Sequence, residues 1–143
     1  MTDPQTITQL IEDLQAAEVG TRELDLRVAI ACGVFAPDNT WKKTGEHTWH
    51  KNFVMGDGIR YSNWDDCFQP KFYSTSIDAA MTTIPERWEF GAMLSYVLSG
   101  QKLYEPELWD KESEETIIGT HKSIPIAICI ASLYAILKEL ETT

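Results

Sequence analysis

Basic residues are scarce in this sequence. The 143-residue chain has 12 Lys plus Arg against 22 Asp plus Glu, a formal net charge of −10. A protein that contacts the phosphate backbone of nucleic acid presents a basic face, so we expect no direct nucleic-acid binding. An acidic protein can instead imitate nucleic acid toward a basic groove of another protein, and that alternative stays open.

Cysteine and metal-binding motifs are also scarce. Cys32, Cys67 and Cys129 are odd in number and stand in no CxxC spacing, which argues against a disulfide framework. His47 and His50 lie three apart in a segment with strand character, where their side chains would point to opposite faces. No HExxH motif accompanies them. We therefore expect no metal and no cofactor.

No hydrophobic run is long enough to cross a membrane. The longest, Ile124 to Leu137, is interrupted by Ser132 and Tyr134 and falls short of the ~20 residues that a spanning helix needs. The opening residues MTDP have neither the basic flank nor the apolar core of a signal peptide. We expect a cytoplasmic protein without membrane contacts.

The overall composition is that of an ordinary globular protein. Hydrophobic residues make up 43% of the chain and charged residues 24%, and this length fits one domain with a core that needs no disulfide or metal. We expect residues 1–143 to form a single domain.

Hydrophobic periodicity predicts the secondary structure. Asp3-Pro4 is typical of a helix start, and Gly56-Asp57-Gly58 is typical of a hairpin turn. Helices are predicted over 4–18, 22–34, 77–84 and 124–141, and strands over 47–55, 59–62, 87–98 and 102–109. The segments 63–66 and 110–115 are polar and are predicted as loops.

The order α-α-β-β-α-β-β-α indicates an α+β fold. Strands joined by short turns pair antiparallel, so we expect one antiparallel sheet sandwiched between helices on both faces. Gly91 favours a bulge in its strand, and Pro106 favours an edge position for its strand. The last helix is apolar nearly all round, which predicts the central helix of the core. Ala127, Ala131 and Ala135 suit close packing against the first two helices.

Three blocks of sequence carry a family resemblance. They are RELDLRVAIACG (22–33), YSTSIDAAMTTIPERWEF (73–90) and HKSIPIAICIASLYAI (121–136). In order and approximate spacing they resemble the phage ABA sandwich domain over residues 21–138, preceded by the helix in 1–20. The resemblance implies a helix–sheet–helix sandwich and a phage origin, hence the host bacterial cytosol, and it implies no reaction.

Two predicted helix starts are rich in hydrogen-bond donors. The unpaired N–H groups of a helix start and its positive dipole attract phosphate, and nearby aromatic rings can stack on a base. Plain helix capping by Ser76 and Ser123 is the simpler interpretation. The candidate ligand-binding residues are Arg60, Tyr61, Trp64, Lys71, Tyr73, Ser74, Ser76, Thr120, His121, Lys122 and Ser123.

These observations favour a binding function without catalysis. We expect a phage accessory protein that sequesters a small phosphate-containing ligand, such as a host antiviral signal nucleotide. One alternative is an acidic inhibitor or nucleic-acid mimic that acts on a host protein through the region from Trp109 to Glu115. Another is a nucleotide hydrolase that uses Asp65, Asp66, His47 or His50.

Several tryptophans stand in polar surroundings, where an indole ring can line an interface. Trp41, Trp49, Trp64 and Trp109 are of this kind, so we expect a homo-oligomer. The acidic run from Glu105 to Glu115 is most simply a solvated edge that also protects a strand from pairing.

Overall fold

The computed structural model describes residues 2–38, 40–54 and 60–141, and for 52–54 and 60–66 it describes the backbone only. These residues form four helices and two three-stranded antiparallel sheets, which confirms the α+β class. The helices are α1 (Pro4–Ala16), α2 (Arg22–Ala31), α3 (Ile77–Met81) and α4 (Ile124–Glu141). The strands are β1 (Trp41–Lys43), β2 (Trp49–Val54), β3 (Arg60–Phe68), β4 (Trp88–Leu98), β5 (Gln101–Asp110) and β6 (Thr116–Ile118).

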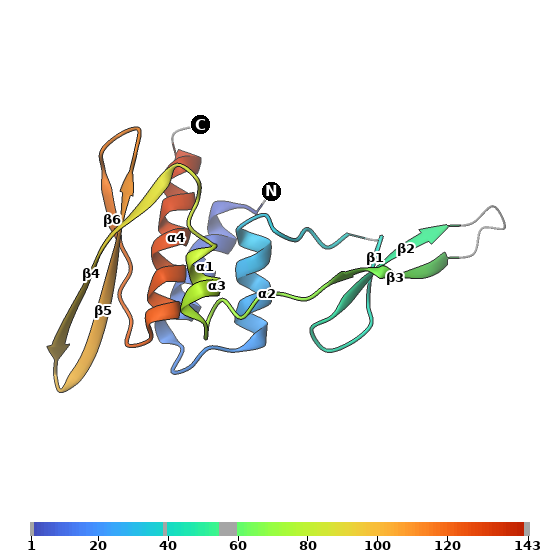
Figure 1. Ribbon diagram of the computed structural model, residues 1–143, viewed down its shortest axis with the longest axis horizontal. Helices are drawn as coiled ribbons and strands as arrows, with labels where there is room; N and C mark the ends of the chain where they lie inside the picture. The colour runs from blue at the N-terminus through green and yellow to red at the C-terminus, as the bar shows by residue number, and fades with distance from the viewer. Residues whose placement is uncertain (1, 39, 55–59, 142–143) are drawn as a thin grey trace.

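The layers differ from the expected single sheet between helices. The strands form sheet A (β1-β2-β3) and sheet B (β4-β5-β6), and the helices lie between the two sheets (Figure 1). The physical reason lies in α4, whose residues 126–133 are all buried. A helix that is apolar all round needs cover on every side. Sheet B covers one side, while α1 and α3 cover others.

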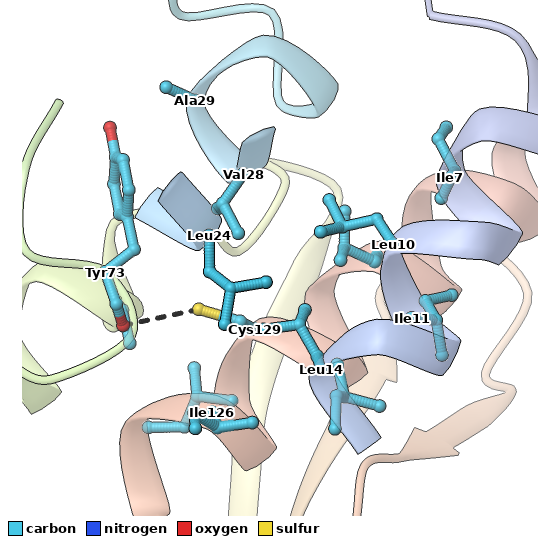
Figure 2. Close-up of a cluster of buried hydrophobic side chains, with 14 of the residues drawn as sticks. Ile7, Leu10, Ile11, Leu14, Leu24, Val28, Ala29, Tyr73, Ile126 and Cys129 are labelled. Atoms are coloured by element: carbon cyan, nitrogen blue, oxygen red, sulfur yellow. Dashed lines mark hydrogen bonds between the residues drawn. The ribbon is translucent and has the colours of Figure 1, made fainter. Parts of the chain in front are cut away.

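The main core forms where α1, α2 and α4 meet. Asp3 caps α1 by accepting the N–H of Thr6, and the apolar side chains of α1 then recur on one face. The same cluster includes Tyr73, whose carbonyl accepts a hydrogen bond from the Cys129 thiol at 3.4 Å (Figure 2). The fully or nearly fully buried members labelled there are Ile7, Leu10, Ile11, Leu14, Leu24, Val28, Ala29, Tyr73, Ile126 and Cys129.

Sheet A projects from the helical layer as an arm (Figure 1). Its base is held by aromatic contacts, in which Phe35 stacks on Phe68 at 4.1 Å and meets Trp41 edge-on at 5.1 Å. The predicted loop over 63–66 is part of β3, where the register shifts opposite His50 and Lys51. The predicted Gly56-Asp57-Gly58 turn lies outside the described residues.

In sheet B the structure confirms one prediction and overturns another. The register shift between Phe90 and Ala92 places a bulge at Gly91, as predicted. Pro106 does not put its strand at an edge, because β5 is the central strand. The proline lies where the ladder to the next strand is interrupted, between β6 and an isolated bridge at His121. Its missing N–H accounts for that interruption.

The alanine stripe of α4 faces sheet B, not the first two helices. Ala131 and Ala135 form a buried cluster with Trp88 and Leu108. At Gly119 the chain runs so close to α4 that an added Cβ would come within 2.3 Å of the Ala127 carbonyl oxygen. Small residues therefore allow close packing on this helix, as predicted. The element that packs against them is sheet B and not the first two helices.

Candidate functional site

The start of α4 was predicted to offer donors to a phosphate. Both ring nitrogens of His121 are engaged: Nε2 donates to the Ala17 carbonyl at 2.8 Å, and Nδ1 accepts the Ser123 N–H at 2.8 Å. These partners select the neutral imidazole. Burial lowers the pKa of His121 and favours the same form. Ser123 in turn caps the helix through the Ile126 N–H, so capping explains its position.

Lys122 and Glu18 form an ion pair beside this helix start. They line a hollow of about 170 Å³ together with Thr120 and His121. Pockets for small organic ligands usually span about 300–1,000 Å³. The hollow is below that range, and the Glu18 carboxylate in its wall repels a phosphate. A nucleotide does not fit here without rearrangement.

Near the start of α3, a carboxylate of the protein itself accepts the hydrogen bonds that a phosphate would need. Ser74 gives its backbone N–H (2.7 Å) and its hydroxyl (2.6 Å) to Oδ1 of Asp25, a fully buried carboxylate on α2. Ser76 caps α3 through the Ala79 N–H. Tyr73 is only 2% exposed, and burial raises the pKa of its hydroxyl. These hydrogen bonds connect α2 to α3. The Ser74 donors are therefore already occupied by Asp25.

One segment covers both helix starts. Residues 17–21, here named the α1–α2 connection, contact His121 through Ala17 and lie against Ser74 through Gly20 and Thr21. An added Cβ on Gly20 would lie 2.3 Å from the Ser74 carbonyl oxygen, which shows how closely the segment packs. The two donor-rich ends are therefore separated by protein, and they do not share a pocket.

The remaining predicted residues are dispersed. Arg60, Tyr61 and Trp64 belong to β3 in the projecting arm, and their side chains are outside the described part. Lys71 is exposed, and its carbonyl accepts a hydrogen bond from Arg22. Thr120 contacts Glu105 on sheet B. The sequence grouping thus spans three separate regions of the molecule.

Two buried carboxylates were missed by the sequence analysis. Asp25 lies in a predicted helix and Asp110 in a predicted polar loop, yet both have zero exposure. Arg22 contacts Asp25 at 2.7 Å, and Arg87 binds Asp110 through two nitrogens at 2.7 and 2.8 Å. The Arg22-x-x-Asp25 spacing was the one local signal, since side chains three apart on a helix are neighbours.

Another hollow lies away from all of these residues. Its volume is about 640 Å³, and it is bordered by the C-terminal ends of α2, α3 and α4. Its walls are mainly apolar, and they include Cys32, Phe35 and Ile84. Burial raises the pKa of Cys32 to about 12, so this thiol stays protonated at neutral pH. No lining side chain is basic, which does not suit a phosphate ligand.

Sheet B instead presents an open surface that the sequence analysis did not predict. Residues paired across an antiparallel ladder share a face, so the register tells which side chains lie together. Trp88, paired with Asp110, faces α4, whereas Tyr96, paired with Leu103, faces away from it. We name the second side the open face. Its apolar residues are Ala92, Leu94, Tyr96, Leu98, Leu103, Trp109 and Ile118.

The exposure of this face follows from where α4 lies. The helix packs against β5, β6 and Trp88 at the start of β4, and the rest of β4 extends beyond it (Figure 1). Leu94 is 54% exposed, Leu98 59% and Ile118 45%. On the other side of β4, Val97 is 67% exposed. Contiguous apolar exposure of this kind marks interaction surfaces on folded proteins.

Carboxylates are interspersed with the apolar side chains of the open face. Glu105 accepts hydrogen bonds from the Tyr96 hydroxyl at 2.8 Å and from Thr120 at 3.2 Å. The bond to this carboxylate raises the pKa of Tyr96, so the phenol remains a donor at neutral pH. Glu89 and Glu107 lie on the same side of the sheet. The face is thus both apolar and anionic.

Comparison with known proteins identifies no relative. No family model matches the chain, and no curated protein or solved structure matches it. The resemblance to the phage ABA sandwich domain therefore stays a prediction. Within the described ranges, no group of three or more His, Cys, Asp or Glu side chains could hold a metal ion, and none of the helices is long and apolar enough to cross a membrane.

Proposed function

We propose that this protein is an acidic protein-binding module whose contact surface is the open face of sheet B. The observation that carries the proposal is a three-stranded sheet with one side on α4 and the other side, among the described residues, apolar and partly exposed. A monomer gains nothing from exposing leucines in this arrangement, whereas burial against a partner is favourable at roughly 25 cal/mol per Å².

The charges on the open face define the chemistry of the partner. Glu89, Glu105 and Glu107 interrupt the apolar surface, and the chain as a whole carries −10. A protein whose apolar patch is bordered by Lys and Arg complements this face, because opposite charges steer encounter and fix orientation. This is the inhibitor alternative of the sequence analysis, moved from the Trp109–Glu115 region onto the sheet itself.

A small phosphate ligand, such as a host signal nucleotide in a phage-infected cell, stays a second prediction. The ion-paired Lys122, the doubly bonded His121 and the buried Ser74 give it weaker support than the open face gives a protein partner. Homo-oligomerisation, the other expectation about partners, is compatible with both.

The test compares proteins retained from a bacterial lysate by the wild-type chain and by two face variants. Ile118→Glu adds a charge to the apolar surface, and Glu107→Lys reverses one of its carboxylates. The matched control is Val19→Glu, because Val19 is 68% exposed but lies on the α1–α2 connection. We expect a protein that wild type and V19E retain and that both face variants lose.

The retained protein is then purified and its binary affinity is measured at rising salt. Binding that weakens with salt and with Glu107→Lys supports the proposal. A retained protein that binds I118E and wild type equally overturns it. A thermal shift with cyclic dinucleotides or ADP-ribose derivatives, in the absence of any retained protein, would instead favour the phosphate ligand.

A further inference from the structure

Beyond the bulge at Gly91, the long strand at the edge of sheet B lacks the usual protection. β4 has 11 residues, whereas the opposite edge strand β6 and the edge strand β1 of sheet A have 3 each. From Phe90 to Leu98 the sequence carries no charge and no proline. Proteins normally guard long edges with lysine, proline, short strands or covering elements, because unpaired backbone groups there pair with other chains.

The hydrogen-bond pattern shows which groups of β4 point outward. Tyr104 and His121 exchange two backbone bonds, at 2.9 and 3.1 Å, so the peptide groups of Tyr104 point away from β4. In an antiparallel ladder this direction alternates along the strand. Leu103 and Glu105 therefore bond to their partners Tyr96 and Leu94.

The residues between those partners face the other way. The N–H and C=O groups of Met93, Ser95 and Val97 point to the outer edge. No strand lies on that side among the residues that the structure describes. The edge therefore presents a regular row of donors and acceptors, spaced as a further strand requires.

We propose that a second copy of this chain occupies this edge, with the two β4 strands antiparallel about a two-fold axis at Ser95. Sheet B then becomes a continuous six-stranded sheet. Met93 lies opposite the partner's Val97, Leu94 opposite the partner's Tyr96, and the two Ser95 residues lie opposite each other. A two-fold interface must be self-complementary, and an uncharged strand with apolar residues on both sides of a small central one meets that condition.

The net charge of the chain favours edge pairing over stacking of two open faces. Stacked sheets lie ~10 Å apart, which would bring Glu105 and Glu107 of both copies together in a desolvated layer. In the edge-paired dimer the two β5 strands are three strand spacings apart, about 14 Å. That distance exceeds the Debye length of about 8 Å at physiological salt. The acidic chain can therefore pair through this edge.

The dimer is independent of the proposed partner protein. Pairing uses the backbone edge of β4 and leaves Ile118 and Glu107, on the far side of the sheet, accessible. Equal partner binding by I118E and wild type, with an intact dimer, would count against the proposed function alone. A monomer that still binds its partner would count against the dimer alone.

The experiment uses Ser95→Lys and Ser95→Glu in the full chain. Like charges directly opposite each other at the axis should raise the dimer dissociation constant up to about fivefold for each variant, measured by analytical ultracentrifugation. Mixing the two variants should restore a dimer that native mass spectrometry identifies as one copy of each. Gln101→Lys and Gln101→Glu are the matched controls, because Gln101 is exposed on β5, away from the edge, and both should dimerise like wild type.

Amide hydrogen exchange adds a readout of the pairing itself. The amides of Met93, Ser95 and Val97 should exchange more slowly in wild type than in S95K, while those of Leu94 and Tyr96 should be protected equally in both. Circular dichroism checks that each variant folds. A wild-type monomer, a dimer that withstands both Ser95 substitutions, or equal exchange at the three outward amides would each overturn the proposal.

Discussion

The two sheets share a topology but are stabilised in different ways. Each has three antiparallel strands in sequence order. Sheet B lies along α4 and buries Trp88 and Leu108 against its alanines, whereas sheet A is anchored at its base through the ring contacts of Phe35. A sheet held along a helix shares the global stability of the core, while an arm held at one end can open by itself. The contact area, more than the strand pattern, therefore decides which sheet is part of the folding unit.

The largest expected effect comes from preventing sheet B from approaching α4. In Gly119→Ala the new Cβ would lie 2.3 Å from the Ala127 carbonyl oxygen and 2.6 Å from the Ala131 nitrogen, both backbone atoms that cannot move aside. We expect the variant to fail to fold or to lose more than about 5 kcal/mol of unfolding free energy. Gly91→Ala is the control, because its nearest contact would be an ordinary 3.5 Å. Urea denaturation of both variants tests this, and equal stabilities would contradict it.

A smaller effect separates the arm from the rest of the molecule. Phe35 is 4% exposed and joins Trp41, Trp49 and Phe68, so Phe35→Ala removes the anchor of sheet A at a cost of about 3–5 kcal/mol. Hydrogen exchange should accelerate in sheet A and remain unchanged in sheet B.

Leu108→Ala serves as the comparison for that variant. Leu108 is fully buried against α4, so its truncation should cost about 2–5 kcal/mol and accelerate exchange across the helices and sheet B together. Equal acceleration of both sheets in Phe35→Ala would show that the arm unfolds only with the core, and the distinction between the two sheets would fail.

The smallest effect is a pH dependence confined to sheet B. The Arg87 guanidinium holds the pKa of Asp110 well below its usual value. Because the folded-state pKa is the lower one, the stabilisation is fully present above about pH 4 and is lost as the pH falls through the acid range. In Arg87→Gln this loss should shrink, since the carboxylate no longer has its charged partner. Denaturation midpoints at neutral and acid pH check it, and parallel pH profiles would contradict it.

Much of the secondary structure follows from the local sequence. The start of α1 at Asp3-Pro4, the bulge at Gly91 and the bounds of α4 were all predicted correctly. Capping residues, glycine and hydrophobic period act within a few residues of their position, so their effect is visible in one segment. The short strands β1 and β6 were missed, because three residues are too few to carry a period.

The candidate sites depended on contacts that no local pattern records. The α1–α2 connection contacts His121, which lies more than a hundred positions further along the chain. Asp25 accepts a hydrogen bond from Ser74, which lies in a distant loop. The open face arises because α4 packs on one side of sheet B and leaves Leu94, Leu98 and Ile118 exposed on the other, which is a matter of how layers are placed.

The sequence alone determined the α+β class, most helix bounds and an acidic surface without metal motifs, because composition and periodicity act locally. The tertiary structure decided that the strands divide into two sheets, that Asp25 and Asp110 are buried, and that no described strand pairs with the outer edge of β4. Packing α4 on every side is a long-range requirement, and it is this requirement that determines which polar groups are covered and which apolar groups stay exposed.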